Sequence, residues 1–262
     1  MSIPDSYRPH TVAPAISVDL PVPRRALAIG AHPDDVEFGC GATLAKWAAS
    51  GCEIFHLILT DGSKGTWDSN VDTTELIATR RREQREAARC LGATHDDHVV
   101  FAGWIDGELE SGLAQRAEVC RWIRHFAPDV VLGHDPWRRY RIHPDHRHAG
   151  LLACEGIVAA RDPKFFPDQT AKPHRPSSLL LWEADEVHHV ESCDNVAIDA
   201  KVRALLSHQS QYETTMHLSS QNRQMTSPQS GIFRQTIMHE AENAARPAGV
   251  ETGEAFALIA SL

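Results

Sequence analysis

The sequence predicts an α/β fold with a mostly parallel sheet and helices on both of its faces. Short apolar runs of strand length alternate along the chain with longer segments of helical periodicity, and this alternation is typical of βαβ units. The chain has 262 residues, of which 42% are hydrophobic and 23% are charged. This is an ordinary globular composition, and the length suits one large α/β domain.

Five apolar runs are expected to form strands, and they cover residues 25–31, 53–59, 98–102, 129–133 and 178–182. Apolar side chains recur at helical spacing between these runs. The expected helices are one that carries Leu44 and Trp47 and ends at Gly51, and others near residues 74–91, 109–126 and 145–160. The alternation of strand-like and helical segments becomes weak after Trp182. The polar stretch 207–240 predicts irregular structure with one or two short helices, and the proline-rich residues 163–176 predict a surface excursion.

Composition and the N-terminal segment limit the function classes. Residues 1–23 lack the apolar segment of a signal peptide and predict a poorly ordered arm. Residues 24–262 are expected to form a single domain. No apolar run approaches the roughly 18–20 residues that cross a bilayer, so no membrane contact is expected. The net charge of −9 disfavours nucleic acid as a partner. Six widely spaced cysteines predict reduced thiols and a cytoplasmic protein. The sequence leaves open whether the protein forms a homo-oligomer.

Charged residues follow the first predicted strand, where the ligand crevice of a parallel sheet lies. The strand leads directly into His32-Pro33-Asp34-Asp35. Because His32 and Asp35 are three residues apart in a helix-opening turn, they can face one side while Asp34 faces another. One imidazole and one carboxylate, with a third ligand from elsewhere, would make a three-ligand catalytic zinc site. The alternative is a capped helix start with Asp35 as the N-cap.

A second His-Pro-Asp group follows the fourth predicted strand. His143-Pro144-Asp145-His146 lies just before an apolar helix, and its histidines are again three residues apart. A single histidine there would more often be a solvated loop residue, but two such groups at strand-to-helix junctions indicate one shared site. The sequence has no HExxH and no GxGxxG after the first strand. These absences exclude the metalloprotease helix and disfavour a nucleotide-binding oxidoreductase.

Taken together, these residues resemble the LmbE/PIG-L superfamily of zinc-dependent N-deacetylases, which act on N-acetylglucosamine-type sugars. The resemblance covers most of residues 24–211. The motifs that carry it are Ala31 to Asp35, Glu37-Phe38-Gly39-Cys40-Gly41, Thr60-Asp61-Gly62, Arg80-x-x-Glu83, Leu91-Gly92 and His143-Pro144-Asp145-His146. Val36 is a departure, because many members carry Glu there. The resemblance implies a Rossmann-like sheet with the zinc site at the carboxyl edge of its strands, and hydrolysis of an amide C–N bond in an amino-sugar-containing small molecule.

The resemblance also implies a role for each matching residue. The ligands of one Zn²⁺ per chain would be His32, Asp35 and His146. Asp34 would be the general base, and His143 would stabilise or protonate the tetrahedral intermediate. Asp145 would hold His143 in its protonated form. The chemistry agrees, because three protein ligands leave a position for water on zinc and an adjacent free carboxylate can accept a proton from that water.

Four further residues are expected at the substrate. By the resemblance, Arg80 and Asp106 would contact sugar hydroxyls, although Arg80 could instead lie on the solvated face of an arginine-rich helix. Trp137 and Tyr140 precede the second motif and could stack on a sugar ring or shape the pocket mouth, or simply pack within their loop. The pair His188-His189 is expected on the surface, and residues 208–211 are expected to have a structural role.

Two other functions stay open. Within the same chemistry, the protein could be an amidase of a glucosamine-containing thiol conjugate of the mycothiol type, because loops set the acyl pocket. In a different class, it could bind metal or carbohydrate without turnover, although the presence of Asp34 argues against this. The motif does not separate zinc from iron or manganese, since a His₂Asp set accepts several metals.

Overall fold

The computed structural model describes residues 16–218 and 228–262, in which eight strands form one sheet in the order β1-β7-β8-β6-β5-β2-β3-β4. The strands are β1 (Ser17–Val18), β2 (Arg25–Gly30), β3 (Glu53–Thr60), β4 (Val99–Trp104), β5 (Val130–His134), β6 (Ser178–Trp182), β7 (His189–Ser192) and β8 (Gly253–Ala260). All neighbouring strands run parallel except β8, which is antiparallel to β6 and β7. The predicted mostly parallel α/β sheet is confirmed.

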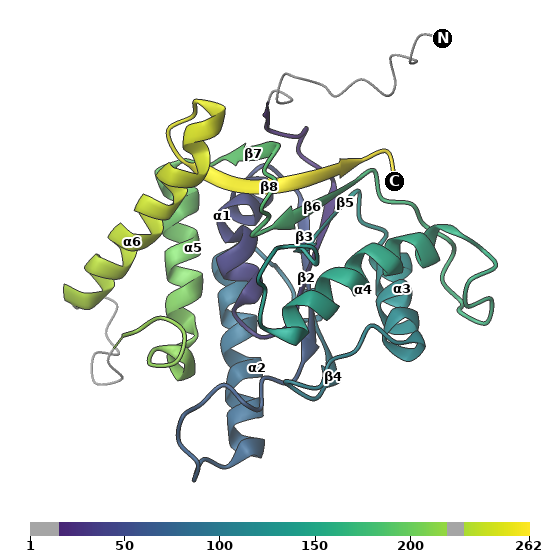
Figure 1. Ribbon diagram of the computed structural model, residues 1–262, viewed down its shortest axis with the longest axis horizontal. Coiled ribbons are helices and arrows are strands. Elements are labelled where there is room, and N and C mark those ends of the chain that lie inside the picture. Colours follow the sequence, from purple (N-terminus) through teal and green to yellow (C-terminus); the bar gives the residue numbers. More distant parts are fainter. Residues whose placement is uncertain (1–15, 219–227) are drawn as a thin grey trace, which may run out of the picture.

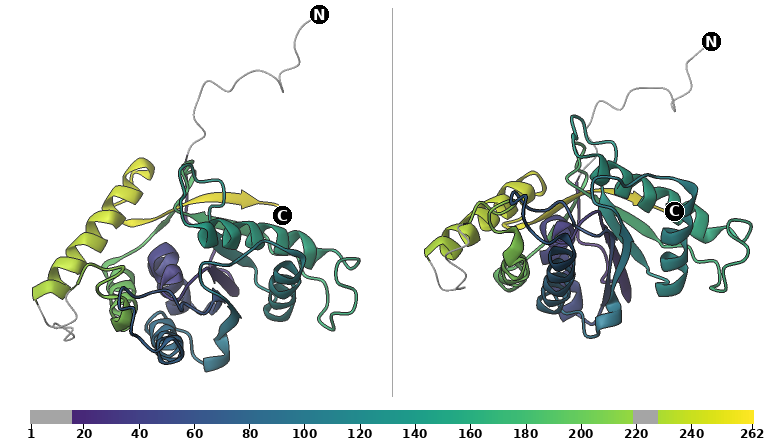
Figure 2. Two further views of the ribbon diagram at one scale, coloured as in Figure 1. Left: turned by 60° about the horizontal axis from the view of Figure 1, so that its bottom comes forward. Right: turned by 90° about the horizontal axis from the view of Figure 1, so that it is seen from below.

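Helices cover both faces of this sheet (Figure 1). They are α1 (Asp35–Ala49), α2 (Thr73–Cys90), α3 (Leu113–Phe126), α4 (Pro144–Arg161), α5 (Asn195–Ser207) and α6 (Pro228–Ala245). Successive β2 side chains enter different cores: Ala26 and Ala28 pack with α1, α2, α5 and α6, while Leu27 and Ile29 pack with α3 and α4. This is the period of two of a strand buried on both faces. Figure 2 shows α6 beyond α5, on the side away from α3 and α4.

Ser17 and Val18 belong to the sheet, although the sequence predicts a poorly ordered arm over residues 1–23. Ser17 and Val18 pair with β7, and the Leu20 N–H donates to Glu191 at 2.8 Å. Of the two histidines expected on the surface, His189 in β7 is instead fully buried and contacts Glu191, whereas His188 is partly exposed. A two-residue strand has no periodicity to detect, and its stability depends on a partner strand far away in the chain. Residues 1–15 lie outside the described residues.

The last part of the chain is more regular than predicted. Residues 219–227 of the polar stretch lie outside the described residues, but its end forms the 18-residue helix α6. Phe233, Ile237 and Ala241 are buried at intervals of four residues, so one face of this helix packs on the rest of the domain, and this packing stabilises it. Within residues 16–218 and 228–262, no helix is both long enough and apolar enough to span a membrane.

Strand β2 marks the point where the order of the strands reverses. The chain extends the sheet from β2 through β3 and β4 in one direction, and through β5 and β6 in the other. Ligands bind beyond the carboxyl ends of strands at such a switch point, which here lies between β2 and β5. Helix α4 approaches the end of β5 closely, because a Cβ on Gly150 would overlap the His134 carbonyl oxygen and lie 2.9 Å from the Pro136 nitrogen.

The variant Gly150→Ala is therefore expected to lower the free energy of unfolding by about 1–3 kcal/mol, the cost of overpacking against rigid backbone. Gly231→Ala in α6 is the control, because a Cβ there would meet no heavy atom within 4 Å and alanine favours a helix more than glycine does. Urea unfolding of both variants measures the two effects. Equal stability of the two variants would contradict the close approach of α4 to β5.

Candidate metal centre and active site

The two His-Pro-Asp groups meet at the switch point of the sheet. His32 follows β2, and the second group opens α4 after β5. The ring centroid of His32 lies 4.7 Å from that of His143 and 5.2 Å from that of His146. The structure thus brings together imidazoles and carboxylates from two distant parts of the sequence, as the motifs predict.

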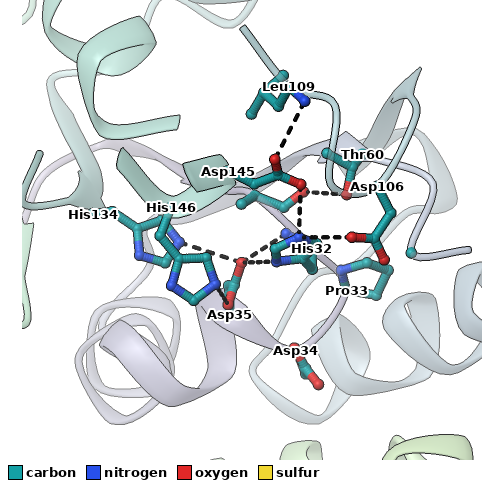
Figure 3. A network of polar contacts seen from close by, with 12 residues as sticks. His32, Pro33, Asp34, Asp35, Thr60, Asp106, Leu109, His134, Asp145 and His146 are labelled. Carbon is teal, nitrogen blue, oxygen red and sulfur yellow. Dashed lines mark hydrogen bonds and ion pairs between the residues drawn. The ribbon is translucent and has the colours of Figure 1, made fainter. Parts of the chain in front are cut away.

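His32 lies at the centre of a network of carboxylates (Figure 3). Its Nδ1 is 3.2 Å from Asp35 Oδ2. Its Nε2 is 3.1 Å from Asp145 Oδ2 and 3.2 Å from Asp106 Oδ1. Although burial opposes it, hydrogen bonds to these carboxylates raise the pKa of His32 well above its ordinary value. The space between Nδ1 and Asp35 therefore favours positive charge, supplied either by a proton or by a metal ion.

Asp35 is a buried carboxylate among imidazoles. Its Oδ2 accepts the backbone N–H of His32 at 2.6 Å, and its Oδ1 lies 3.3 Å from His146 Nε2. Although burial raises it, the charges of His146 and His134 hold the pKa of Asp35 well below its usual range. Asp35 is thus an anion whose two oxygens face different histidines.

The cluster fits a metal ion by the chemistry of its donors. Among the described residues, three groups have ligand atoms within 4.8 Å of one another, namely His32 with His143 and His146, Asp35 with His134 and His146, and His32 with Asp106 and Asp145. The predicted set of His32, Asp35 and His146 is divided between the first two groups. Imidazole and carboxylate are ligands that zinc prefers. A proton on Nε2 of His32 shared with Asp145 leaves the Nδ1 lone pair available, as in metal sites whose histidine is oriented by a carboxylate.

His134 was not predicted as part of this site. It is the last residue of β5, and its Nε2 lies 3.3 Å from Asp35 Oδ2. Its Nδ1 accepts the Trp182 indole N–H at 3.0 Å, and an indole can only donate. A proton on Nε2 lets His134 donate to Asp35, and although burial lowers it, Asp35 and Glu183 raise the pKa of His134 above its ordinary value. Its position at the carboxyl end of a strand was the available sequence signal.

Asp34 occupies a strained position between β2 and α1. Its backbone is left-handed, with φ 98°, and its N–H donates to Gln84 Oε1 at 3.0 Å. Burial, aided by the charge of Asp35, raises the pKa of Asp34 to about 6 against the opposing charge of Arg80. Asp34 points away from Asp35 (Figure 3), as predicted from the spacing. Strain at a non-glycine residue is characteristic of functional sites.

Arg80 and Asp106 line the same cavity, of about 380 Å³, as His32 and Asp34. Arg80 is only 3% exposed, which excludes the alternative of a solvated helix face. Its Nη1 donates to the Gly62 carbonyl at 2.9 Å, its Nη2 donates to the Pro33 carbonyl at 2.7 Å, and Nη2 lies 3.6 Å from Asp34 Oδ2. Although burial raises it, His32 holds the pKa of Asp106 at about 2.

The predicted contact between Asp145 and His143 is wrong. Asp145 accepts the backbone N–H groups of Gly107 and Leu109 at 2.6 and 3.3 Å and contacts His32 instead. His143 is the N-cap of α4, whereas Asp145 lies inside its first turn. Burial and the charges of His32 and His146 lower the pKa of His143, so it is a neutral imidazole here.

Trp137 and Tyr140 do not reach the catalytic cavity. Trp137 is 62% exposed and lines a separate cavity, and Tyr140 is 94% exposed. The left-handed backbone of Tyr140, with φ 58°, accompanies an outward-facing ring, while the next residue, Arg141, is buried and pairs with Glu183 at 2.9 Å. The expected contacts of these two aromatic residues with substrate are therefore not supported by their placement.

A fully buried polar group lies behind Asp34 and was also missed. Gln84 Nε2 donates to Glu37 Oε1 at 2.6 Å, and Glu37 Oε2 lies 3.3 Å from His208 Nε2. Gln84 thus connects this ion pair to the backbone N–H of Asp34. Glu37 opens one of the motifs that carry the resemblance, and His208 opens the segment 208–211. No local pattern shows that these residues, 171 positions apart, form an ion pair.

An α/β sheet whose edge combines imidazoles, carboxylates and a buried free carboxylate is typical of a metal-dependent hydrolase. The family description "PIG-L: GlcNAc-PI de-N-acetylase" matches residues 27–157. A diacetylchitobiose deacetylase of Thermococcus kodakarensis is 34% identical over 192 residues, 72% of this chain and 70% of the relative. A 1D-myo-inositol 2-acetamido-2-deoxy-alpha-D-glucopyranoside deacetylase of Rhodococcus jostii is 29% identical over 64% of each chain.

The solved structure of N,N'-diacetylchitobiose deacetylase from Pyrococcus horikoshii, complexed with its inhibitor MPG, is also similar. It superimposes with a TM-score of 0.77 at 28% sequence identity, over 91% of this chain and 84% of that chain. The chain belongs to the PIG-L (LmbE) family. The predicted family and the predicted enzyme class, a hydrolase of the amide bond, are confirmed by these relatives.

The variant His208→Gln is expected to destabilise the protein more at neutral pH than at alkaline pH. Although burial lowers it, Glu37 raises the pKa of His208 above its ordinary value. The charged ring therefore adds stability that is complete below the unfolded pKa and is lost as the pH rises through the folded pKa. Urea unfolding from about pH 6 to about pH 9 should show the difference between the two proteins shrink. A difference that does not change with pH would rule out a charged His208.

Proposed function

We propose that this protein is a metal-dependent hydrolase that removes an N-acetyl group from an amino-sugar-containing small molecule. The observation that carries the proposal is the buried free carboxylate of Asp34, which lines one cavity together with His32, Asp35 and His146. The names of the relatives support it, because they are deacetylases of diacetylchitobiose and of an acetamido-glucopyranoside.

In this proposal His32, Asp35 and His146 hold one Zn²⁺ per chain. Their nitrogen and oxygen donors favour zinc over the harder divalent ions. When bound, zinc supplies Lewis acidity, which polarises water and an acyl carbonyl. Asp145 and Asp106 hold the Nε2 side of His32, and His134 holds Asp35, so each of these supporting residues fixes the direction of a ligand.

Asp34 is the proposed general base and later the general acid. Its raised pKa of about 6 suits a group that accepts a proton from water near neutral pH and then delivers it to the leaving amine. Arg80, 3.6 Å from Asp34 Oδ2, keeps this carboxylate in place while its other donors hold the surrounding loops. His143, at the exposed side of the cluster, would donate a hydrogen bond to the acyl oxygen as negative charge develops there.

The two other functions can be compared with deacetylation by the residues that each would need. An amidase of a mycothiol-type conjugate would use the same residues and differ only in the acyl group, whereas the relatives' names favour acetyl. A protein that only binds metal or sugar would have no use for Asp34. We further propose a cytoplasmic location, because all six cysteines are free thiols and unpaired cysteines are characteristic of a reducing compartment.

The decisive experiment compares the wild type with Asp34→Asn and His146→Ala. Amine release from N-acetylglucosamine and N,N'-diacetylchitobiose is measured with fluorescamine, and metal content is measured by elemental analysis. We expect Asp34→Asn to keep its metal but to lose activity by about 10²- to 10⁴-fold, and His146→Ala to lose both. Near-wild-type turnover of metal-loaded Asp34→Asn would refute the base assignment, and a wild type that is active without metal would refute the metal-dependent mechanism.

A second prediction concerns Asp145, which contacts His32 rather than substrate. Asp145→Asn is expected to weaken zinc binding by about 10- to 100-fold, the usual effect of removing a carboxylate that orients a ligating histidine. Competition with a chromophoric chelator measures the affinity directly. Asp135→Asn is the matched control. Asp135 is also a buried carboxylate, but its Oδ1 accepts the backbone N–H of Trp137. Equal zinc affinities of the two variants would show that Asp145 does not support His32.

A further inference from the structure

The catalytic cavity has an outer wall that the proposed reaction does not use. Its inner wall consists of the charged groups described above. The outer wall is formed by Lys64, Thr66 and Trp67 from the loop after β3, and by Gln211, Thr214 and Thr215 from the segment after α5. The cavity therefore continues beyond the reacting groups into a region lined by one lysine, by uncharged polar side chains and by the indole of Trp67.

The loop that carries this wall is held by other parts of the protein on the N-terminal side of Trp67. The Gly65 carbonyl accepts the Gln211 amide N–H at 3.0 Å, and the Lys64 N–H donates to Asp106 Oδ2 at 3.0 Å. Gly65 packs so closely on Arg80 that a Cβ there would overlap the guanidinium. After Trp67, Asp68 Oδ1 accepts the Asn70 N–H at 2.9 Å. The ring of Trp67 thus projects from a loop whose preceding residues, Lys64 and Gly65, are held in place.

Trp67 is 82% exposed, although its loop contacts the interior. Leaving an indole in water forgoes the stabilisation of about 25 cal/mol for each Å² of apolar surface that burial would give. An exposed aromatic ring on a cavity wall suits a ligand with a flat apolar face, and an indole has only two side-chain torsions to order on binding. The hydroxyls of Thr214 and Thr215 supply hydrogen-bonding groups elsewhere on the same wall.

We propose that Trp67 forms an outer subsite that stacks on a second ring joined to the reacting amino sugar. The inference rests on the proposed deacetylase function and specifies its substrate class: a glycoside with a ring-shaped aglycone, either a sugar or an aromatic group. The inner cavity holds the acetamido sugar, and the second ring lies against the indole. The protein accordingly prefers such glycosides to the free monosaccharide.

The test compares wild type, Trp67→Ala and Trp67→Phe on three substrates: N-acetylglucosamine, N,N'-diacetylchitobiose and p-nitrophenyl N-acetyl-β-glucosaminide. Trp67→Ala is expected to lower kcat/KM by about three- to tenfold on the two-ring substrates, the range of one aromatic contact, through KM rather than kcat. The monosaccharide should change less than about twofold, and Trp67→Phe should restore most of the loss. A loss on the disaccharide alone assigns the subsite to a sugar, and a loss on the aryl glycoside alone assigns it to an aromatic aglycone.

The matched control is Trp137→Ala, which removes another exposed indole that lines a different cavity. Equal losses on all three substrates, or equal effects of the Trp67→Ala and Trp137→Ala substitutions, would overturn the subsite. If the wild type releases no amine from any substrate, the proposed function fails separately. Calorimetric titration of zinc-loaded wild type and Trp67→Ala with the aryl glycoside then decides the subsite, because equal affinity would refute it and weaker binding by the variant would support it.

Discussion

The site depends on one electrostatic constraint, the burial of several carboxylates around a single imidazole. Asp35, Asp106 and Asp145 all lie within 3.2 Å of a ring nitrogen of His32. Like charges at this density are costly in a medium of low dielectric unless positive charge lies between them. The imidazoles supply part of this charge, and a divalent cation supplies it more completely. The cluster therefore favours positive charge at this place, which is what the proposed metal ion would supply.

The fold places these groups together because two strands end at one edge. His32 lies beyond the end of β2 and His134 ends β5, so the switch point of the sheet brings together residues that are far apart in the sequence. Close backbone approach completes the arrangement, since Gly150 lets α4 pack on the end of β5 and so brings His146 to Asp35. Stability and ligand geometry are thus determined by the same contacts.

Much of this was predictable, for identifiable reasons. Alternating apolar runs give the bounds of β2 and β6 nearly to the residue, and two His-Pro-Asp groups after strands indicate the cluster. The direction of the Asp145 side chain was not predictable from spacing, because it contacts His32 rather than His143, its near neighbour in sequence. Strand β8 was missed because an antiparallel strand from the chain's end enters between β6 and β7, a pairing of long range that leaves no local trace.

The division of labour between Asp34 and Asp35 follows from their surroundings, although the two are adjacent in sequence. Both are buried, which raises the pKa of any carboxyl group. For Asp35 the histidines outweigh burial and keep it an anion, whereas for Asp34 burial outweighs Arg80 and its pKa rises to about 6. The left-handed backbone at Asp34 turns its side chain away from the histidines. Two identical groups with opposite shifts are the pattern of an acid–base residue beside a ligand, and here one strained backbone angle separates them.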